Sequence, residues 1–235
     1  MALHHRDDTG PEQPGPLRRE YTAELDQLRL QVELLAVRVD QNLERMRQVL
    51  VRGDGPVAVE ALAADDDIDA MSVSLTARCY DVLAREQPVA SDLRFVVSVL
   101  RVLAEFERIG DLALRVVKLV DDHDLLAANP VTFDLLMRMA DDALDRYRTA
   151  MRAWAGQDLV AASAVTSPSP SAGDRYRRLT EELVALDGPG AVRLAIPTLV
   201  AARSLDRISD HAGIIGTRLL YLLTGDADHL ADEVR

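Results

Sequence analysis

The chain has 235 residues, 48% of them hydrophobic and 28% charged, so it can bury the core of one large domain or two small ones. Its formal net charge is -12, and the resulting negative potential repels nucleic-acid backbones and anionic lipid head groups. Direct binding of nucleic acid is therefore not expected, and no apolar run approaches the roughly 20 residues that a membrane span needs.

The N-terminal segment and the single cysteine both favour a cytoplasmic protein. Residues 1–16 carry charged and histidine side chains but no apolar stretch, so they predict a disordered tail and no secretion signal or membrane anchor. Cys79 stands in a helical pattern beside Tyr80 and Val82 and is expected to be a buried small hydrophobic residue without a disulfide partner.

The pattern of apolar residues and turn signals predicts six long helices. Aromatic residues make up only 4% of the chain, while Ala, Leu, Val and Arg dominate, which favours helices over sheets. In the first segment, apolar residues recur at intervals of three and four from Leu17 to Leu43. The expected helices cover about 17–52, 56–85, 88–120, 130–154 and 158–186, with a sixth between Gly188-Pro189-Gly190 and Gly225.

Two helix starts and one break are predicted from local sequence. Asp54 and Asn129 precede Pro56 and Pro130, and each supplies a capping side chain at the start of a helix. The fifth helix contains Ser167-Pro168-Ser169-Pro170, and proline inside a helix removes a hydrogen bond and clashes with the preceding turn. We therefore expect a kink or a break there.

An internal repeat joins the third and sixth helices. Residues 93–113 align with residues 192–212 at a constant offset, which matches Arg94 with Arg193, Arg108 with Arg207, and Asp111 with Asp210. The repeating unit is therefore three helices, and the fold class is all-α, a tandem repeat of two three-helix bundles. The expected organisation is an N-terminal tail (1–16), a first repeat (17–124), a second repeat (125–226) and a C-terminal tail (227–235).

Each repeat carries a pair of acidic residues one helical turn apart. The pairs are Glu107 with Asp111 and Asp206 with Asp210. Glu107 shares a stripe with apolar residues of its helix, so we expect it to face other helices, where a carboxylate needs an arginine, a cation or a proton. Simple salt bridges on a solvated face are the alternative that spacing alone leaves open.

A further acidic group, Asp65 to Asp69, lies in the second helix. Asp69 shares a stripe with Leu62, Val73 and Tyr80 and is expected to point inward. If the second and third helices pack antiparallel, Asp65 and Asp69 come level with the acidic pair of the third helix. Four converging carboxylates would suit Mg, Ca, Mn or Fe. The alternative is an acidic run exposed to solvent.

Ala84 to Arg94, followed by Glu107-Arg108-Ile109-Gly110-Asp111, resembles the signature of the PhoU family of phosphate transport regulatory proteins. The resemblance extends over about residues 17–226 and includes the closing segment Tyr221 to Gly225. It implies two three-helix bundles side by side in a cytoplasmic, negative regulator of the phosphate regulon. It also implies contacts with the ATPase subunit of the phosphate ABC transporter and with a sensor histidine kinase.

The resemblance further implies metal binding, because some members hold multinuclear iron or zinc clusters through these acidic motifs. The candidate ligands for Fe, Zn, Mn or Mg are Asp65, Asp69, Glu107 and Asp111 in the first repeat and Asp174, Asp206 and Asp210 in the second. The first site is favoured, because Pro170 stands where the second would have an aspartate. We also expect a homodimer that meets the membrane only through its partners, with partner contacts through Arg94, Arg108, Arg193 and Arg207.

Two other classes of function are alternatives to a non-enzymatic regulator. A carboxylate-bridged metal enzyme would need Glu-x-x-His pairs, and the sequence contains none, nor a phosphate-binding loop or a Gly-x-Ser-x-Gly nucleophile motif. His211 lies beside Asp210 and is expected to be an ordinary hydrogen-bonded histidine. A helical adaptor that binds no metal is the second alternative.

Overall fold

The computed structural model describes residues 16–167 and 170–231, about 90% of which are helical, with no strand among them. The predicted all-α fold is confirmed, whereas almost all of the predicted N-terminal tail lies outside the described residues. The elements are α1 (Pro16–Arg52), α2 (Gly55–Glu86), α3 (Ala90–Val117), the 3-10 helix η1 (Val120–Asp122), α4 (His123–Ala127), α5 (Pro130–Gly156), α6 (Leu159–Thr166), α7 (Pro170–Val184), α8 (Ala191–Thr224) and α9 (Asp228–Ala231).

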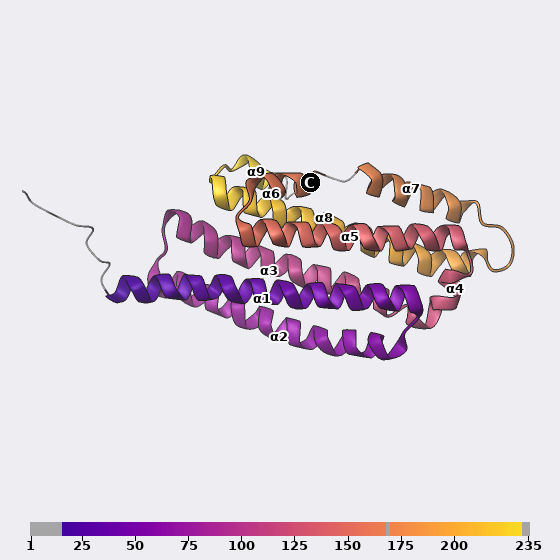
Figure 1. Cartoon of the computed structure of the whole chain (residues 1–235), viewed down its shortest axis with the longest axis horizontal. Helices are drawn as coiled ribbons and strands as arrows, with labels where there is room; N and C mark the ends of the chain where they lie inside the picture. The colour runs from indigo at the N-terminus through magenta and orange to yellow at the C-terminus, as the bar shows by residue number, and fades with distance from the viewer. Residues whose placement is uncertain (1–15, 168–169, 232–235) are drawn as a thin grey trace, which may run out of the picture.

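The long helices lie side by side along the long axis of the molecule (Figure 1). Helices α1, α2 and α3 pack on one another as the first bundle, and α5, α6 and α7 pack with α8 as the second. Helices α3 and α8 form the most extensive contact between the two bundles, so each repeat contributes its last long helix to the centre of the molecule. Helices η1 and α4 connect the repeats.

Both predicted N-caps are confirmed. Oδ1 of Asp54 accepts a hydrogen bond from the backbone N of Val57 at 3.2 Å. Oδ1 of Asn129 accepts from the backbone N of Val131 at 3.0 Å and from that of Thr132 at 3.2 Å. These bonds satisfy backbone donors that have no partner within the first helical turn, so the two helices begin where the sequence indicated.

The predicted break in the fifth helix is also confirmed. Helix α6 ends at Thr166 and α7 begins at Pro170, with residues 168 and 169 outside the described part of the chain. The third helix is shorter than expected, because α3 ends at Val117 and the chain continues in tighter turns. One such turn is closed by the backbone N of Leu119, which donates to the carbonyl of Val116 at 3.0 Å.

The two bundles share one hydrophobic core. Tyr147 of α5 is fully buried, and its ring meets the ring of Phe106 of α3 edge-on at 6.3 Å between centroids. Its hydroxyl donates to the carbonyl oxygen of Ala36 in α1 at 2.8 Å, which satisfies the polar group inside the core. Cys79 is 0% exposed, as predicted. The core therefore runs through helices of both repeats without interruption.

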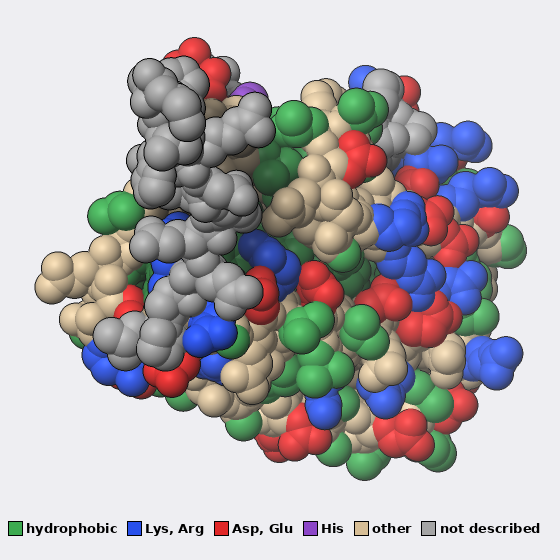
Figure 2. All heavy atoms as spheres, turned by 60° about the vertical axis from the view of Figure 1, so that its left-hand side comes forward, with side chains coloured by type: hydrophobic (Ala, Val, Ile, Leu, Met, Phe, Trp, Pro, Cys, Tyr) green, Lys and Arg blue, Asp and Glu red, His purple; other side chains and the backbone are tan. Residues whose placement is uncertain are grey.

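Among the described residues, no helix combines the length and the apolar character needed to cross a bilayer. The described surface mixes charges of both signs, and Figure 2 shows acidic and basic side chains interspersed with apolar ones over one face. On this face the negative net charge is not gathered into a single acidic patch.

Candidate functional site

The repeated acidic and basic motifs lie at the middle of the two central helices, which run antiparallel. Near one end, Nε of Arg94 in α3 donates to the carbonyl oxygen of Leu222 in α8 at 3.4 Å. Near the middle, Nδ1 of His211 donates to Oε2 of Glu105 at 2.6 Å. Residues late in α8 thus face residues early in α3, and the two copies of the motif meet across the same contact.

The first acidic group does bring residues of α2 and α3 together. Asp65 is half-buried beside Gly110, where a Cβ would stand 3.1 Å from Oδ1 of Asp65. Burial, followed by the nearby carboxylates of Asp69 and Asp111, raises the pKa of Asp65 from 3.8 to about 6. The packing of α2 against α3 therefore brings Asp111 within electrostatic range of Asp65, and the fourth predicted carboxylate, Glu107, is not among the groups that act on Asp65.

The predicted inward orientation of Glu107 and Asp69 is wrong, since both residues are exposed. On α2 the buried stripe passes through Ala61, Ile68 and Leu75. Asp69 follows Ile68 by one residue, which turns its side chain by about 100° around the helix, out of that stripe. The other members of the predicted inward stripe are exposed as well: Leu62 by 40%, Val73 by 71% and Tyr80 by 60%.

The side chains of the first acidic group, in the positions that the structure shows, do not form a complete metal site. Within the described residues, Asp65, Asp69, Glu107 and Asp111 form no ion pair, although the charge of Lys118 acts to lower the pKa of Asp65. However, no group of three or more His, Cys, Asp or Glu side chains in the described part of the chain is arranged to hold a metal ion. Binding there would require the exposed carboxylates to change rotamer.

The second acidic group differs because arginines accompany its members. Asp174 pairs with Arg177 at 2.5 Å, and Asp206 pairs with Arg203 at 2.6 Å. Burial lowers the pKa of Arg146 of α5, while the carboxylates of Asp210 and Asp206 act to raise it. The second repeat thus places a guanidinium near the acidic pair of α8, which neutralises charge that a cation would otherwise neutralise.

Sequence reasoning missed the buried carboxylate of this region, Glu105. Its side chain is 8% exposed, and besides His211 it accepts a hydrogen bond from Nη1 of Arg108 at 2.6 Å. The signal was present, because Glu105 follows Val102 by three residues and precedes Ile109 by four, both of which are buried. His211 is hydrogen-bonded, as expected, and its partner belongs to the other repeat.

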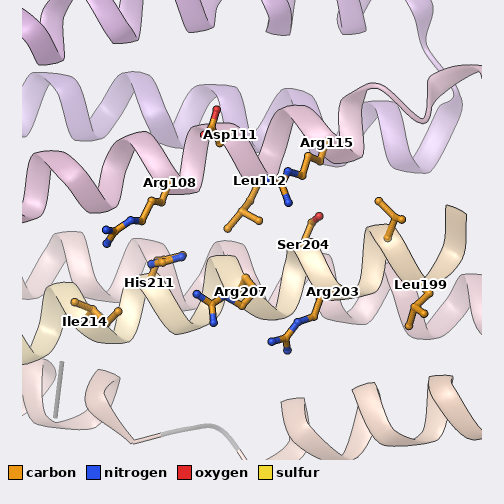
Figure 3. Close-up of a pocket in the computed structure, with 11 residues that line it drawn as sticks. Arg108, Asp111, Leu112, Arg115, Leu199, Arg203, Ser204, Arg207, His211 and Ile214 are labelled. Atoms are coloured by element: carbon orange, nitrogen blue, oxygen red, sulfur yellow. The ribbon is translucent and has the colours of Figure 1, made fainter. Parts of the chain in front are cut away.

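A groove of about 880 Å³ lies between α3 and α8 (Figure 3). Two of the four arginines proposed as partner contacts, Arg108 and Arg207, line it together with Arg115 and Arg203. Arg193 is exposed near the start of α8, outside the groove lining. Arg94 is half-buried against the end of α8, where a Cβ on Gly225 would lie 3.4 Å from its guanidinium carbon. Arg94 therefore has a structural role in holding the two central helices together.

The two-bundle fold, the repeated motif and the bridged central helices define a tandem-repeat helical protein of the PhoU type. The PhoU domain matches residues 32–120 and 136–219, so the chain belongs to the PhoU family. It is 27% identical over 219 residues to a Pseudomonas putida protein named phosphate-specific transport system accessory protein PhoU homolog, covering 90% of this chain and 84% of that protein.

Solved structures agree with the family assignment. The crystal structure of PhoU from Pseudomonas aeruginosa superposes with a TM-score of 0.81 at 28% identity, covering 88% of this chain and 100% of that one. The phosphate transport system regulatory protein PhoU from Streptococcus pneumoniae superposes with a TM-score of 0.76 at 22% identity, over 88% of this chain and 98% of that one. The latter supports the fold alone.

Proposed function

We propose that this protein is a non-enzymatic, cytoplasmic regulator of phosphate homeostasis. It would limit uptake by the high-affinity phosphate ABC transporter and repress the phosphate regulon when phosphate is abundant. The observation that carries the proposal is the match of both repeats to the PhoU domain, together with relatives named as accessory proteins of phosphate-specific transport.

The proposed mechanism is contact with other proteins: the ATPase subunit of the transporter, a sensor histidine kinase and a second copy of this chain. A rigid scaffold suits this role, because the shared core and the hydrogen bond from His211 to Glu105 hold the two repeats in one register. Arg193 and Arg207 are exposed and available to a partner. Arg108 is already paired with Glu105, so a partner would have to compete for its guanidinium.

Deletion of the gene tests the regulatory function. In medium rich in phosphate, the deletion strain should express phosphate-starvation genes that the parent represses, and a plasmid copy of the gene should restore repression. A transcriptional reporter fused to a starvation promoter measures both states. Normal repression in the deletion strain would contradict the proposal. Purified ATPase subunit and the kinase's cytoplasmic domain, each mixed with this protein in a pull-down, test the contacts separately.

Cation binding by Asp65, Asp69 and Asp111 is a second proposal. It is favoured by one observation: the pKa of Asp65 is raised, first by burial and then by the nearby carboxylates of Asp69 and Asp111. A divalent ion beside them would remove that repulsion. Hard oxygen ligands suit Mg and Mn, and Fe or Zn are the other candidates. The group of Asp174, Asp206 and Asp210 is proposed as the weaker site because arginines accompany it.

A further inference from the structure

The repeated motif of α3 and α8 brings arginines from both helices to one groove, while its acids also act on the outer helices. Asp111 acts on Asp65 of α2, and Asp210 acts on Arg146 of α5, so both acids influence the outer helices. Asp111 also lines the groove between α3 and α8 (Figure 3). The arginines of the same motifs line the groove between the two central helices. The groove lining thus carries four arginines and one acidic residue, Asp111.

Two of the four groove arginines form no hydrogen bond or ion pair within the described residues. Arg108 is held by Glu105 and Arg203 by Asp206, each at 2.6 Å. Arg115 of α3 and Arg207 of α8 are exposed and form neither an ion pair nor a hydrogen bond with any residue that the structure describes. Two arginines without a hydrogen bond or ion pair thus face one groove from different helices, although the charge of Arg207 also acts on Asp206, in a chain whose net charge is -12.

An anion is the ligand that such a groove favours. Guanidinium groups facing a common space repel one another, and an anion between them turns the repulsion into attraction. The planar fork of arginine matches phosphate oxygens and forms paired, charge-assisted hydrogen bonds. A phosphoryl group offers more oxygens and more negative charge than a carboxylate, so it can engage guanidinium groups from two helices at once.

The rest of the groove indicates that the anion carries an organic part. Apolar side chains make up much of the remaining lining: Leu112, Leu199, Val200 and Ile214. The volume of about 880 Å³ lies within the range of roughly 300–1,000 Å³ that small-molecule sites occupy and is much larger than a single phosphate ion. A phosphate ester with an apolar or aromatic body would contact both the arginines and the apolar residues of the groove.

We propose that the groove between α3 and α8 binds a phosphorylated small molecule. Arg115 and Arg207 hold its phosphoryl groups, and the apolar residues contact its organic body. A nucleotide and free inorganic phosphate are the two sources of this chemistry, and the apolar lining favours the nucleotide. The inference goes beyond the proposed regulatory function and does not depend on it, because ligand binding is measured on the isolated protein without transporter or kinase.

Isothermal titration calorimetry on the full chain tests the proposal, with EDTA present to exclude binding through metal ions. The probes are ATP, AMP and inorganic phosphate, with adenosine and citrate as unphosphorylated controls. ATP or AMP should bind, whereas adenosine and citrate should not. Replacing both exposed arginines, R115A/R207A, should weaken binding at least tenfold. R115K/R207K keeps the charge but lacks the fork, and its loss should be smaller.

The matched control is R38A/R101A, which removes the same charge from exposed arginines of α1 and α3 that do not line the groove. It should bind like the wild type. Equal weakening in this control would overturn the proposal, because net charge and not the groove would then control affinity. Failure of every phosphorylated probe, or equal binding of citrate, would also overturn it. If inorganic phosphate binds as tightly as AMP, recognition of the phosphoryl group holds and free phosphate is its source.

Discussion

Nδ1 of His211 in α8 lies 2.6 Å from Oε2 of Glu105 in α3, and their side chains are only 6% and 8% exposed. This hydrogen bond joins the central helices of the two repeats inside the protein. An ionised carboxylate can only accept hydrogen bonds, so the imidazole donates from Nδ1. Because the second oxygen of Glu105 accepts from Arg108, the same carboxylate also positions one of the groove arginines.

The two partners of this hydrogen bond should be coupled in their effect on the free energy of unfolding. E105L and H211L each leave a buried polar partner unsatisfied, and each should lower the free energy of unfolding by about 1–3 kcal/mol. The double variant removes both polar groups, so its loss should be clearly smaller than the sum of the two single losses. Urea denaturation of the four proteins measures the cycle. Strict additivity would show that the two side chains are not coupled.

Asp65 should make stability fall as pH rises through the mildly acidic range. Its folded pKa is about 6 and its ordinary value is 3.8. The native state therefore keeps the proton to a higher pH than the unfolded chain, so the unfolding free energy decreases between about pH 4 and pH 6 and stays lower above that. With EDTA present, D65N should melt above the wild type at neutral pH and equally below about pH 4.

The control for this titration is D67N, a change of the same charge at an exposed position of the same helix. It should not show the same pH-dependent difference from the wild type. If D65N and D67N shift the melting temperature equally at every pH, the effect comes from overall charge and the environment of Asp65 plays no part.

The proposed cation site predicts a metal-dependent melting temperature. Saturating Mn should stabilise the wild type, by roughly 2.7 kcal/mol at a hundredfold excess over the dissociation constant. D65N/D111N should lose this gain, whereas E107Q should keep most of it, because Glu107 is not among the groups that shift the pKa of Asp65. Differential scanning calorimetry with Mn and with chelator measures both. Identical melting temperatures in the two conditions would contradict the cation site and favour an adaptor that binds no metal.

Two glycines should respond in opposite directions to alanine. A Cβ on Gly216 of α8 would lie 3.0 Å from the carbonyl oxygen of Ala162 and 3.1 Å from a methyl of Val165, so G216A must push α6 outward. We expect a loss of about 1–3 kcal/mol. At Gly173 of α7 no described atom lies within 4 Å, so G173A should stabilise by up to about 1 kcal/mol. Thermal melts of both variants measure these changes. A melting temperature of G173A below that of the wild type would contradict the open surroundings of Gly173.

The sequence by itself determined the long helices, several of their ends and their duplication. Asp54 and Asn129 cap the helices that follow them, and the Ser-Pro repeat separates α6 from α7, because caps and prolines act on backbone groups within one or two turns. The repeated motif likewise predicted that two equivalent units exist, since a constant offset between two segments can be read from the chain alone.

Only the tertiary structure decided how much of the surface of each helix is buried. Periodicity places residues around a helix, but the neighbouring helices determine how wide the covered arc is. Helix α3 lies between α1, α2 and α8, so its buried arc is broad and includes Glu105, while α2 buries a narrow stripe that leaves Asp69 outside. The partner of Glu105 is His211, 106 positions along the chain, and no local pattern could pair them before the two repeats packed together.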